Sequence, residues 1–293
     1  MRSIFRLLIA ASALILVAAV SVSCETEGGK GENTVPVNSE LSADSAPFVI
    51  YCFKAGKADA FAITTESSAV IIDAGEKGFG QTVLDYLEKV GKKSVDCMII
   101  THFDKDHVGG AAKIINSIPV SRVLQSNFPK DSKEFDKYSK ALEKSAITAE
   151  TVAEGLEFEL DGVTYTVDPP AREIYNEDTS NNSSLIVKIK YGERTFLFTG
   201  DAEEERIAEY LKGNDADCDV LKVPHHGVWN DKTDALVSAS TPRYALITSS
   251  DGEPEDEKTV SLLESNGAEA FLTRKDTVTV VSDGESIYAY YGN

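Results

Sequence analysis

The chain has 293 residues, of which 42% are hydrophobic and 26% are charged, a composition typical of a globular protein. Its formal net charge is −19 at pH 7, and such an acidic chain repels the phosphate backbone of nucleic acid at long range. A protein that coats long nucleic acid is therefore disfavoured, whereas a small site built around a cation can still bind a phosphate.

Residues 1–23 have the pattern of a signal peptide. Two arginines precede an uncharged apolar stretch over about residues 7–22, and small residues lead to Cys24. The pattern resembles a lipoprotein cleavage site, at which the cysteine is lipidated, although Ser21 stands where such sites usually have leucine. Ordinary cleavage and an uncleaved membrane anchor are the alternatives. All three place the remaining chain at the extracellular face of the cytoplasmic membrane or outside the cell.

Residues 24–46 are polar, rich in glycine, serine and glutamate, and without hydrophobic periodicity. This composition predicts a flexible tether, followed by a folded domain over 47–293. The later cysteines, Cys52, Cys97 and Cys218, are odd in number and have no CxxC spacing. Their pattern argues against a disulfide framework and against a cysteine-rich zinc site.

Strands and helices alternate from residue 47 onward. Apolar runs predict strands over 47–53, 59–66, 68–75, 96–101, 121–126, 218–227 and 243–250, and hairpins over 154–170 and 181–202. Helical periodicity and capping predict helices over 80–90, 109–118, 130–150, 202–213, 231–240 and 257–267. The tail, 268–292, reads as two or three strands with a turn at Asp283-Gly284. This order predicts an α/β (α+β) fold with two sheets sandwiched between helix layers.

Potential metal ligands follow three of the predicted strands. They are His102, Asp104, Asp106 and His107 after the first, Asp201 after the second, and His225 and His226 after the third. Strand ends on a common sheet edge are a standard location for a site. An acidic surface supplies aspartates at random, but it does not explain why all four histidines of the chain lie at two strand ends. We therefore favour a metal site over solvated loop residues.

The spacing allows one or two divalent ions. His102 and Asp104 point to the same side of an extended segment, whereas Asp106 and His107 are separated by a turn. One loop can thus serve two ions, with Asp201 as a bridge. Imidazole combined with carboxylate suits zinc, manganese or iron.

The segment THFDKDHVGG resembles the HxHxDH signature of the metallo-β-lactamase fold. VIIDAG, FTGDA and VPHHG follow the family's pattern, and NNSSL with LKVPHHG matches the competence-protein ComEC-type branch. KAGKADAF resembles the opening GxGDA strand of that branch, with Asp59 in place. The resemblance spans about residues 48–250. It implies a four-layer αβ/βα sandwich and a metal-dependent hydrolase, with Asp59 and Asp73 in supporting roles.

Two departures from the family pattern affect the metal site. Asp104 replaces the second histidine of the signature, which shifts the preference toward manganese or magnesium. No histidine lies between His107 and His225, so the first metal position is weak, or Asn181 or Asn182 fills it in part. One tight ion at Asp106, His107, Asp201 and a late histidine is the alternative to two.

The late ligand is expected to be His226, because the family's equivalent often precedes glycine. His225 would then contact the substrate or support the site.

The resemblance also suggests roles in catalysis. Asp106 would orient the attacking water or accept its proton. Asn181, Asn182 and Ser184 would hold substrate oxygens, and Lys222 would neutralise a phosphate if it points into the cleft; otherwise it is a surface lysine. Trp229 is either a stacking wall or part of the core, and the core is favoured.

Three functions are compatible with the sequence. The favoured one is an extracellular, membrane-tethered hydrolase with one or two divalent ions (Zn or Mn), acting as a phosphodiesterase or nuclease-like enzyme on a small-molecule or phosphodiester substrate. The second is a lactonase or β-lactamase that cleaves a cyclic ester or amide. The third is a non-catalytic surface binding module with a weakened metal site. In each case an N-terminal lipid or anchor would join the chain to the membrane.

Overall fold

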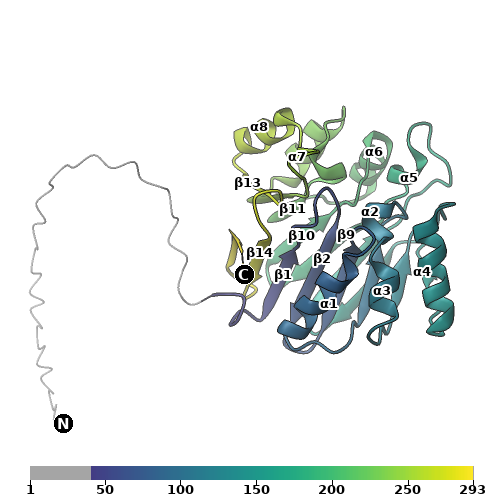
Figure 1. Cartoon of the computed structure of the whole chain (residues 1–293). Helices are drawn as coiled ribbons and strands as arrows, with labels where there is room; N and C mark the ends of the chain where they lie inside the picture. The colour runs from purple at the N-terminus through teal and green to yellow at the C-terminus, as the bar shows by residue number, and fades with distance from the viewer. Residues whose placement is uncertain (1–40, 293) are drawn as a thin grey trace, which may run out of the picture. The chain divides into compact units, whose positions relative to one another are not determined.

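The computed structural model describes residues 41–292, which form two β-sheets packed face to face and covered by helices on their outer faces (Figure 1). This four-layer αβ/βα sandwich confirms the predicted fold class. The predicted signal peptide and most of the predicted tether lie outside the described residues. No helix within 41–292 is both long and apolar enough to cross a membrane.

The first sheet has eight strands in the order β15-β14-β1-β2-β3-β4-β5-β6. Its strands from β3 to β6 pair in parallel, whereas β15 to β3 pair antiparallel. Their bounds are β1 Phe48–Cys52, β2 Ala60–Thr65, β3 Ala69–Ala74, β4 Cys97–Ile100, β5 Val123–Gln125, β6 Glu150–Thr151, β14 Val278–Ser282 and β15 Ile287–Tyr291.

The second sheet has seven strands in the order β13-β12-β11-β10-β9-β8-β7. Strands β10 to β13 pair in parallel, and β7 to β10 pair antiparallel. Their bounds are β7 Leu156–Leu160, β8 Val163–Asp168, β9 Ile186–Tyr191, β10 Arg194–Phe198, β11 Val220–Lys222, β12 Tyr244–Ile247 and β13 Glu269–Leu272.

The helices lie in two groups on the outer faces of the sheets (Figure 1). The first sheet carries α1 Gly80–Lys89, α3 Ala111–Ile115 and α4 Lys133–Lys144, and the second carries α6 Glu204–Gly213, α7 Thr233–Ser240 and α8 Glu257–Ser265. Three short elements occupy loops: α2 Lys105–Val108, α5 Thr179–Asn182 and the 3-10 turn η1 Pro224–Gly227. Each group of helices buries one apolar face on its sheet, and a third apolar cluster fills the space between the sheets.

Strand burial follows from these layers. All five residues of β1 are buried, because this strand is covered on both faces. In β8 the side chains of Val163, Tyr165 and Val167 are buried between the sheets, and the threonines between them are not. The sequence pattern therefore distinguishes doubly covered strands from those covered on one face.

Several predicted boundaries differ from the structure. The predicted helix 130–150 is limited to α4, which the Ser132 side chain caps by accepting the Phe135 N–H and which ends before Ala146 (φ 53°). Residues 109–118 form only the short α3, preceded by α2. The start of the predicted hairpin at 181 belongs to α5, because the Asp178 side chain accepts the Asn181 N–H at 3.1 Å. The tail forms three strands divided between the sheets.

Gly110 allows the loop after β4 to lie against β3. A Cβ atom at this position would lie 2.1 Å from the carbonyl oxygen of Ala74, closer than packed atoms can approach. Its backbone is right-handed and helical (φ −85°), so the glycine is needed for its missing side chain and not for a special turn.

Arg206 is fully buried and joins α6 to the segment before β9. Its guanidinium donates to the carbonyl of Ser184 at 3.0 Å and to the Asp168 carboxylate at 2.7 Å. Its backbone N–H donates to the side-chain oxygen of Asn182 at 2.9 Å. These bonds fix the chain immediately before β9, where the Ser184 side chain contacts Asp201 of the candidate site.

Replacing Arg206 by alanine is expected to lower the free energy of unfolding by about 3 kcal/mol, because the groups it bonds lose their donor inside the protein. Urea unfolding followed by circular dichroism measures the change. Lys137→Ala is the control: it removes an exposed pair with Glu134 (3.4 Å) and should cost less than about 0.5 kcal/mol. Equal losses in the two variants would contradict this assignment.

Candidate metal centre

Three strand ends from the two sheets meet at one site. The loop after β4 and the turn α2 carry His102, Asp104, Asp106 and His107; the end of β10 leads to Asp201; and β11 leads through η1 to His225 and His226. Ligand atoms from Asp59, His107, Asp201 and His226 all lie within 4.8 Å of one another. The predicted convergence of the three strand ends is therefore present.

Two imidazoles point their Nε2 atoms at the same carboxylate oxygen. His107 Nε2 lies 3.2 Å and His226 Nε2 lies 3.0 Å from Asp201 Oδ2, and Asp106 Oδ2 lies 3.3 Å from His226 Nε2. Both Nε2 atoms are buried and make no hydrogen bond. Because buried polar atoms are normally partnered, this arrangement fits a divalent cation held by His107, His226, Asp201 and Asp106.

The other nitrogen of each ring is held by a neighbouring group. His107 Nδ1 lies 2.8 Å from Asp73 Oδ2, and the same carboxylate accepts the hydroxyl of Thr101 at 2.6 Å. His226 Nδ1 lies 2.9 Å from the hydroxyl of Thr248. These contacts orient the rings so that the Nε2 atoms face the site, which is the usual supporting arrangement around metal-bound histidine.

Asp59 supports the site and is not its best ligand. Its Oδ2 lies 2.6 Å from the ammonium of Lys222, and its Oδ1 accepts the hydroxyl of Thr248 at 2.6 Å. Both oxygens are thus occupied, whereas the carboxylate of Asp106 is 19% exposed and faces His226. We therefore assign Asp106, and not Asp59, to the group that would hold the ion.

Lys222 is neither a surface lysine nor a group that faces a substrate. Its side chain is fully buried, and its ammonium donates to the carbonyl of Gly200 at 2.8 Å as well as contacting Asp59. It also lies 3.5 Å from Asp201 Oδ1, the oxygen that points away from the two imidazoles. Its contacts indicate that it neutralises these carboxylates.

The adjacent histidines of η1 point in different directions. Both have left-handed backbone conformations, with φ of 45° at His225 and 55° at His226. His226 is buried at the site, whereas His225 is partly exposed and its Nδ1 lies 3.0 Å from Glu203 Oε1. The geometry therefore favours His226 as the ligand and leaves His225 at the rim.

His102 and Asp104 form a separate side of the site. The imidazole of His102 is buried, its Nδ1 lies 3.2 Å from the Thr101 hydroxyl, and its Nε2 lies 3.8 Å from Asp104 Oδ1 without a hydrogen bond. Asp104 is bound instead by Lys130 and by the hydroxyl of Ser180. These two residues join the site but do not share the carboxylate oxygen on which His107 and His226 converge.

Two of the residues predicted to contact the substrate form hydrogen bonds within the protein instead. Asn182 is fully buried, where its side chain donates to the Glu177 carbonyl at 3.1 Å and accepts the Arg206 N–H. Ser184 Oγ accepts the N–H of Asp201 at 3.1 Å and so positions the central carboxylate. These placements do not fit a substrate role for either residue.

Asn181 lies next to the rim, where it donates to Glu203 at 2.9 Å. Trp229 is partly exposed, with Lys258 Nζ 3.4 Å from its ring centroid, so its predicted place in the core is wrong.

The electrostatics of the site favour bound positive charge. Burial disfavours the protonated ring of His226, but Asp201 and Asp106 raise its pKa to about 10. Burial acts in the same way on His107, and Asp201 and Asp73 nevertheless raise its pKa well above the usual value. Burial would raise the pKa of Asp106, yet the two histidines hold it at about 2. In the metal-free protein the surrounding carboxylates therefore favour the protonated form of both rings.

These protons balance the buried carboxylates. Asp59, Asp73 and Asp201 are buried, and the ammonium of Lys222 offsets one of their charges. The two imidazolium groups offset the other two. A divalent ion can replace both protons without changing the charge of the buried group, so metal and protons compete for one site.

Sequence reasoning missed Lys130, Thr248 and Glu203 as members of the site. Thr248 follows strand β12 on the same sheet edge as the other ligands, so its position at a strand end was an available signal. Lys130 lies in a charged segment without any distinguishing pattern, and nothing in the sequence pointed to it.

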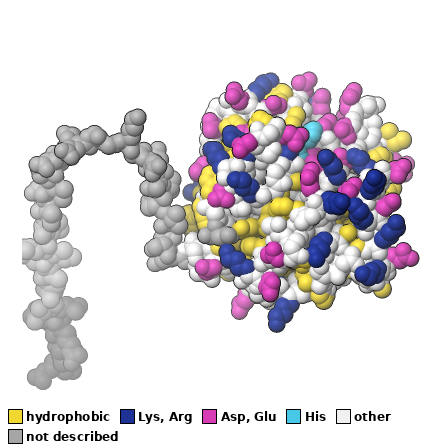
Figure 2. All heavy atoms as spheres, viewed as in Figure 1, with side chains coloured by type: hydrophobic (Ala, Val, Ile, Leu, Met, Phe, Trp, Pro, Cys, Tyr) yellow, Lys and Arg dark blue, Asp and Glu magenta, His cyan; other side chains and the backbone are white. Residues whose placement is uncertain are grey.

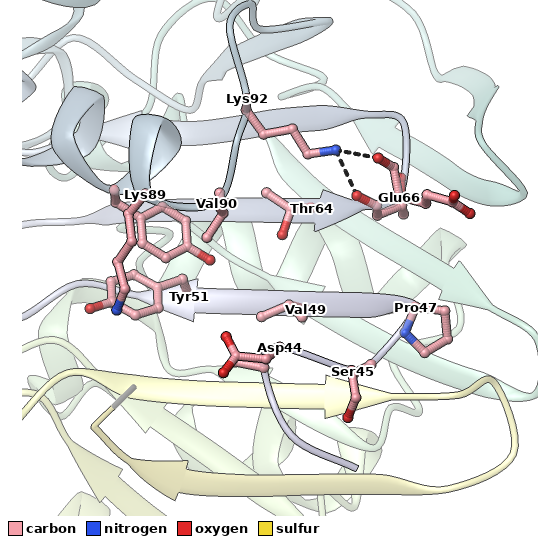
Figure 3. A pocket seen from close by; sticks show the side chains of 14 residues that line it. Asp44, Ser45, Pro47, Val49, Tyr51, Thr64, Glu66, Lys89, Val90 and Lys92 are labelled. Atoms are coloured by element: carbon pink, nitrogen blue, oxygen red, sulfur yellow. Dashed lines mark hydrogen bonds between the residues drawn. The ribbon is translucent and has the colours of Figure 1, made fainter. Parts of the chain in front are cut away.

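A cavity of about 520 Å³ lies elsewhere, where the chain enters β1 (Figure 3). It is lined by residues 43–47 and by side chains that include Tyr51, Tyr86 and Lys92, and by none of the candidate ligands. The ammonium of Lys92 already donates to the carbonyl of Glu66 at 2.7 Å. This cavity is therefore distinct from the metal centre.

The fold and the cluster define a metal-binding αβ/βα sandwich. The chain belongs to the metallo-beta-lactamase superfamily, because the model of that family matches residues 54–249. Its similarity to curated competence and recombination proteins supports the predicted ComEC-type branch of that superfamily.

The chain is similar to two curated proteins named for competence or recombination. ComE operon protein 3 of Bacillus subtilis is 29% identical over 176 residues, which cover 59% of this chain and 22% of that protein. Recombination protein 2 of Haemophilus influenzae is 25% identical over 206 residues, which cover 68% of this chain and 24% of that protein. The chain thus matches only about a quarter of each relative's length.

Solved structures share the fold at low sequence identity. The metallo-beta-lactamase fold protein YhfI from Bacillus subtilis superposes with a TM-score of 0.52 and 11% identity, over 83% of this chain and 100% of that one. CmlA, a diiron beta-hydroxylase from Streptomyces venezuelae, has a TM-score of 0.50 and 15% identity, over 77% and 52% of the two chains. Identities this low show the common fold and nothing about activity.

Asparagine substitutions at the two adjacent histidines should separate their roles, because asparagine tolerates the left-handed backbone of η1. His226→Asn is expected to weaken zinc or manganese binding at least about 100-fold, since a ligand is lost. His225→Asn should change the affinity less than about threefold. Calorimetric titration of each purified variant provides the measurement. A larger loss in His225→Asn would reverse the assignment.

Metal affinity should rise with pH, because His107 and His226 bind protons that the ion must displace. Between pH 6 and 8 the apparent association constant is expected to increase by about 10- to 100-fold per pH unit, for one to two displaced protons. Titration in buffers of different ionisation enthalpy counts the protons released. A pH-independent affinity without proton release would contradict the charge balance described above.

Proposed function

We propose that this chain is a metal-dependent hydrolase that cleaves phosphodiester bonds at the extracellular face of the cytoplasmic membrane. The observation that carries the proposal is the pair of buried, unbonded Nε2 atoms of His107 and His226, which face Asp201 beside the partly exposed Asp106. The family supports hydrolysis in general, and the predicted signal peptide supports the location.

The residues around the ion would divide the work of catalysis. A divalent ion supplies Lewis-acid activation of an oxygen and acidifies a water. His226 and His107 lower the pKa of Asp106 to about 2, so its carboxylate is ionised at neutral pH and can accept a hydrogen bond that orients a water. Asp73 and Thr248 hold the imidazoles in place, and Lys222 keeps Asp59 and Asp201 from repelling each other.

Substrate contacts are reassigned to groups at the rim. Lys130 and His225 are partly exposed, with side-chain exposures of 37% and 23%, and both can donate hydrogen bonds to anionic oxygens. Histidine appears only as a small cyan patch on the face drawn in Figure 2, and His102, His107 and His226 are buried. A lysine ammonium and an imidazole donor at the opening favour a phosphodiester over an uncharged cyclic ester.

A second candidate function is a surface binding module without catalysis. The contacts of Asp104 favour this function. Lys130 and Ser180 bind its carboxylate, which is therefore a poor ligand for an additional ion. Metal content distinguishes the two functions, because the module needs no tightly bound ion.

The purified full chain, loaded with manganese or zinc, is expected to hydrolyse bis-p-nitrophenyl phosphate faster than nitrocefin or a lactone. Replacing both Asp106 and His107 by alanine should reduce this activity at least about 1,000-fold, because the nucleophile's orientation and a ligand are lost together. Asp136→Ala, an exposed substitution on α4, serves as the control and should retain full activity. Activity that survives the double substitution would show that this centre is not the catalyst. Faster turnover of nitrocefin or the lactone than of bis-p-nitrophenyl phosphate would instead indicate a cyclic substrate.

A further inference from the structure

Lys130 contacts Asp104, which with His102 forms the pair that the sequence predicts to serve one of two ions. Its ammonium lies 2.5 Å from Asp104 Oδ1 and 3.3 Å from the hydroxyl of Ser180. That hydroxyl donates to the same Oδ1 atom. A single carboxylate oxygen therefore accepts two donors, one of them charged.

The oxygen that Lys130 occupies is the one that faces His102. His102 Nε2, a buried atom without a hydrogen bond, lies 3.8 Å from Asp104 Oδ1. A second ion between these residues would need the same Oδ1 lone pairs that the ammonium and the Ser180 hydroxyl already use. It would also lie beside the positive charge of the ammonium, which repels it.

The opposite side of the site has no such obstruction. Lys222 approaches the Oδ1 atom of Asp201 at 3.5 Å and leaves Oδ2 to the imidazoles of His107 and His226. The two lysines thus neutralise different carboxylates: Lys222 contacts Asp59 and Asp201, and Lys130 contacts Asp104.

Packing fixes Lys130 in this position. It lies just before α4, whose first turn is capped by the Ser132 side chain. The ring of Phe135 in that turn packs against Phe103 of the motif loop, with centroids 4.6 Å apart. The start of α4 is therefore attached to the loop that carries Asp104, which keeps the ammonium close to the carboxylate.

We propose that Lys130 is a built-in cation that replaces a second metal ion, so that the centre holds one divalent ion per chain. This inference rests on the proposed function, because it takes the ion at His107, Asp201 and His226 as given. The exposed side of Lys130 would then meet the anionic oxygen of the substrate, a role that a second ion fills in a two-metal site.

The test measures how many manganese ions the full chain binds, by calorimetric titration together with metal analysis of the dialysed protein. The wild type is expected to bind one ion. Lys130→Met keeps an unbranched side chain of nearly the same length and removes its charge. This variant should bind two ions, the second at least about tenfold more tightly than any second ion in the wild type. Electron paramagnetic resonance should show the spin coupling of a manganese pair in this variant only.

Lys133→Met is the matched control, because Lys133 is an exposed lysine at the start of the same helix and no contact joins it to Asp104. It should bind one ion like the wild type. Ser180→Ala tests the other donor to Asp104 and should raise the affinity for a second ion by a smaller factor than Lys130→Met.

The outcomes separate this inference from the proposed function. Two ions of similar affinity in the wild type, or a folded Lys130→Met variant that still binds one, would overturn the role of Lys130 and leave the hydrolase proposal intact. A wild type that binds no ion and hydrolyses nothing would overturn both.

Discussion

Buried carboxylates without matching positive charge are unfavourable, and the whole centre depends on meeting this requirement. Asp59, Asp73 and Asp201 are buried at the edge where the two sheets meet, and all three carboxylates lie near the imidazole of His107. Lys222 supplies one positive charge, and the protons of His107 and His226 supply two. An ion of charge +2 carries the same charge as the two protons that it replaces, which explains why a divalent cation suits this cluster.

The sandwich makes this concentration of charge tolerable. Strand β4 belongs to one sheet, and β10 and β11 belong to the other, so the ligands come from separate rigid supports. Apolar clusters lie between the sheets and beneath both helix layers, and they supply the stability that a cluster of buried charges does not. The close approach at Gly110 then allows the ligand loop to lie directly on β3, where Asp73 can hold His107.

The layered fold and the site location were predictable from the sequence, because both depend on local patterns. Apolar runs that end in histidine and aspartate showed which strand ends would meet. The roles of Lys222 and Asn182 were not predictable, since their partners lie on other elements and only the packed structure shows that both are buried. Lys130 was missed for the same reason, because a lysine in a charged segment normally faces solvent.

Anomalous X-ray diffraction from crystals of the manganese- or zinc-loaded protein tests the central claim most directly. The account predicts one strong peak per chain, about 2.0–2.3 Å from the Nε2 atoms of His107 and His226 and bonded to an oxygen of Asp201. A peak bound to other residues, or no peak in protein that was saturated with metal, would contradict it.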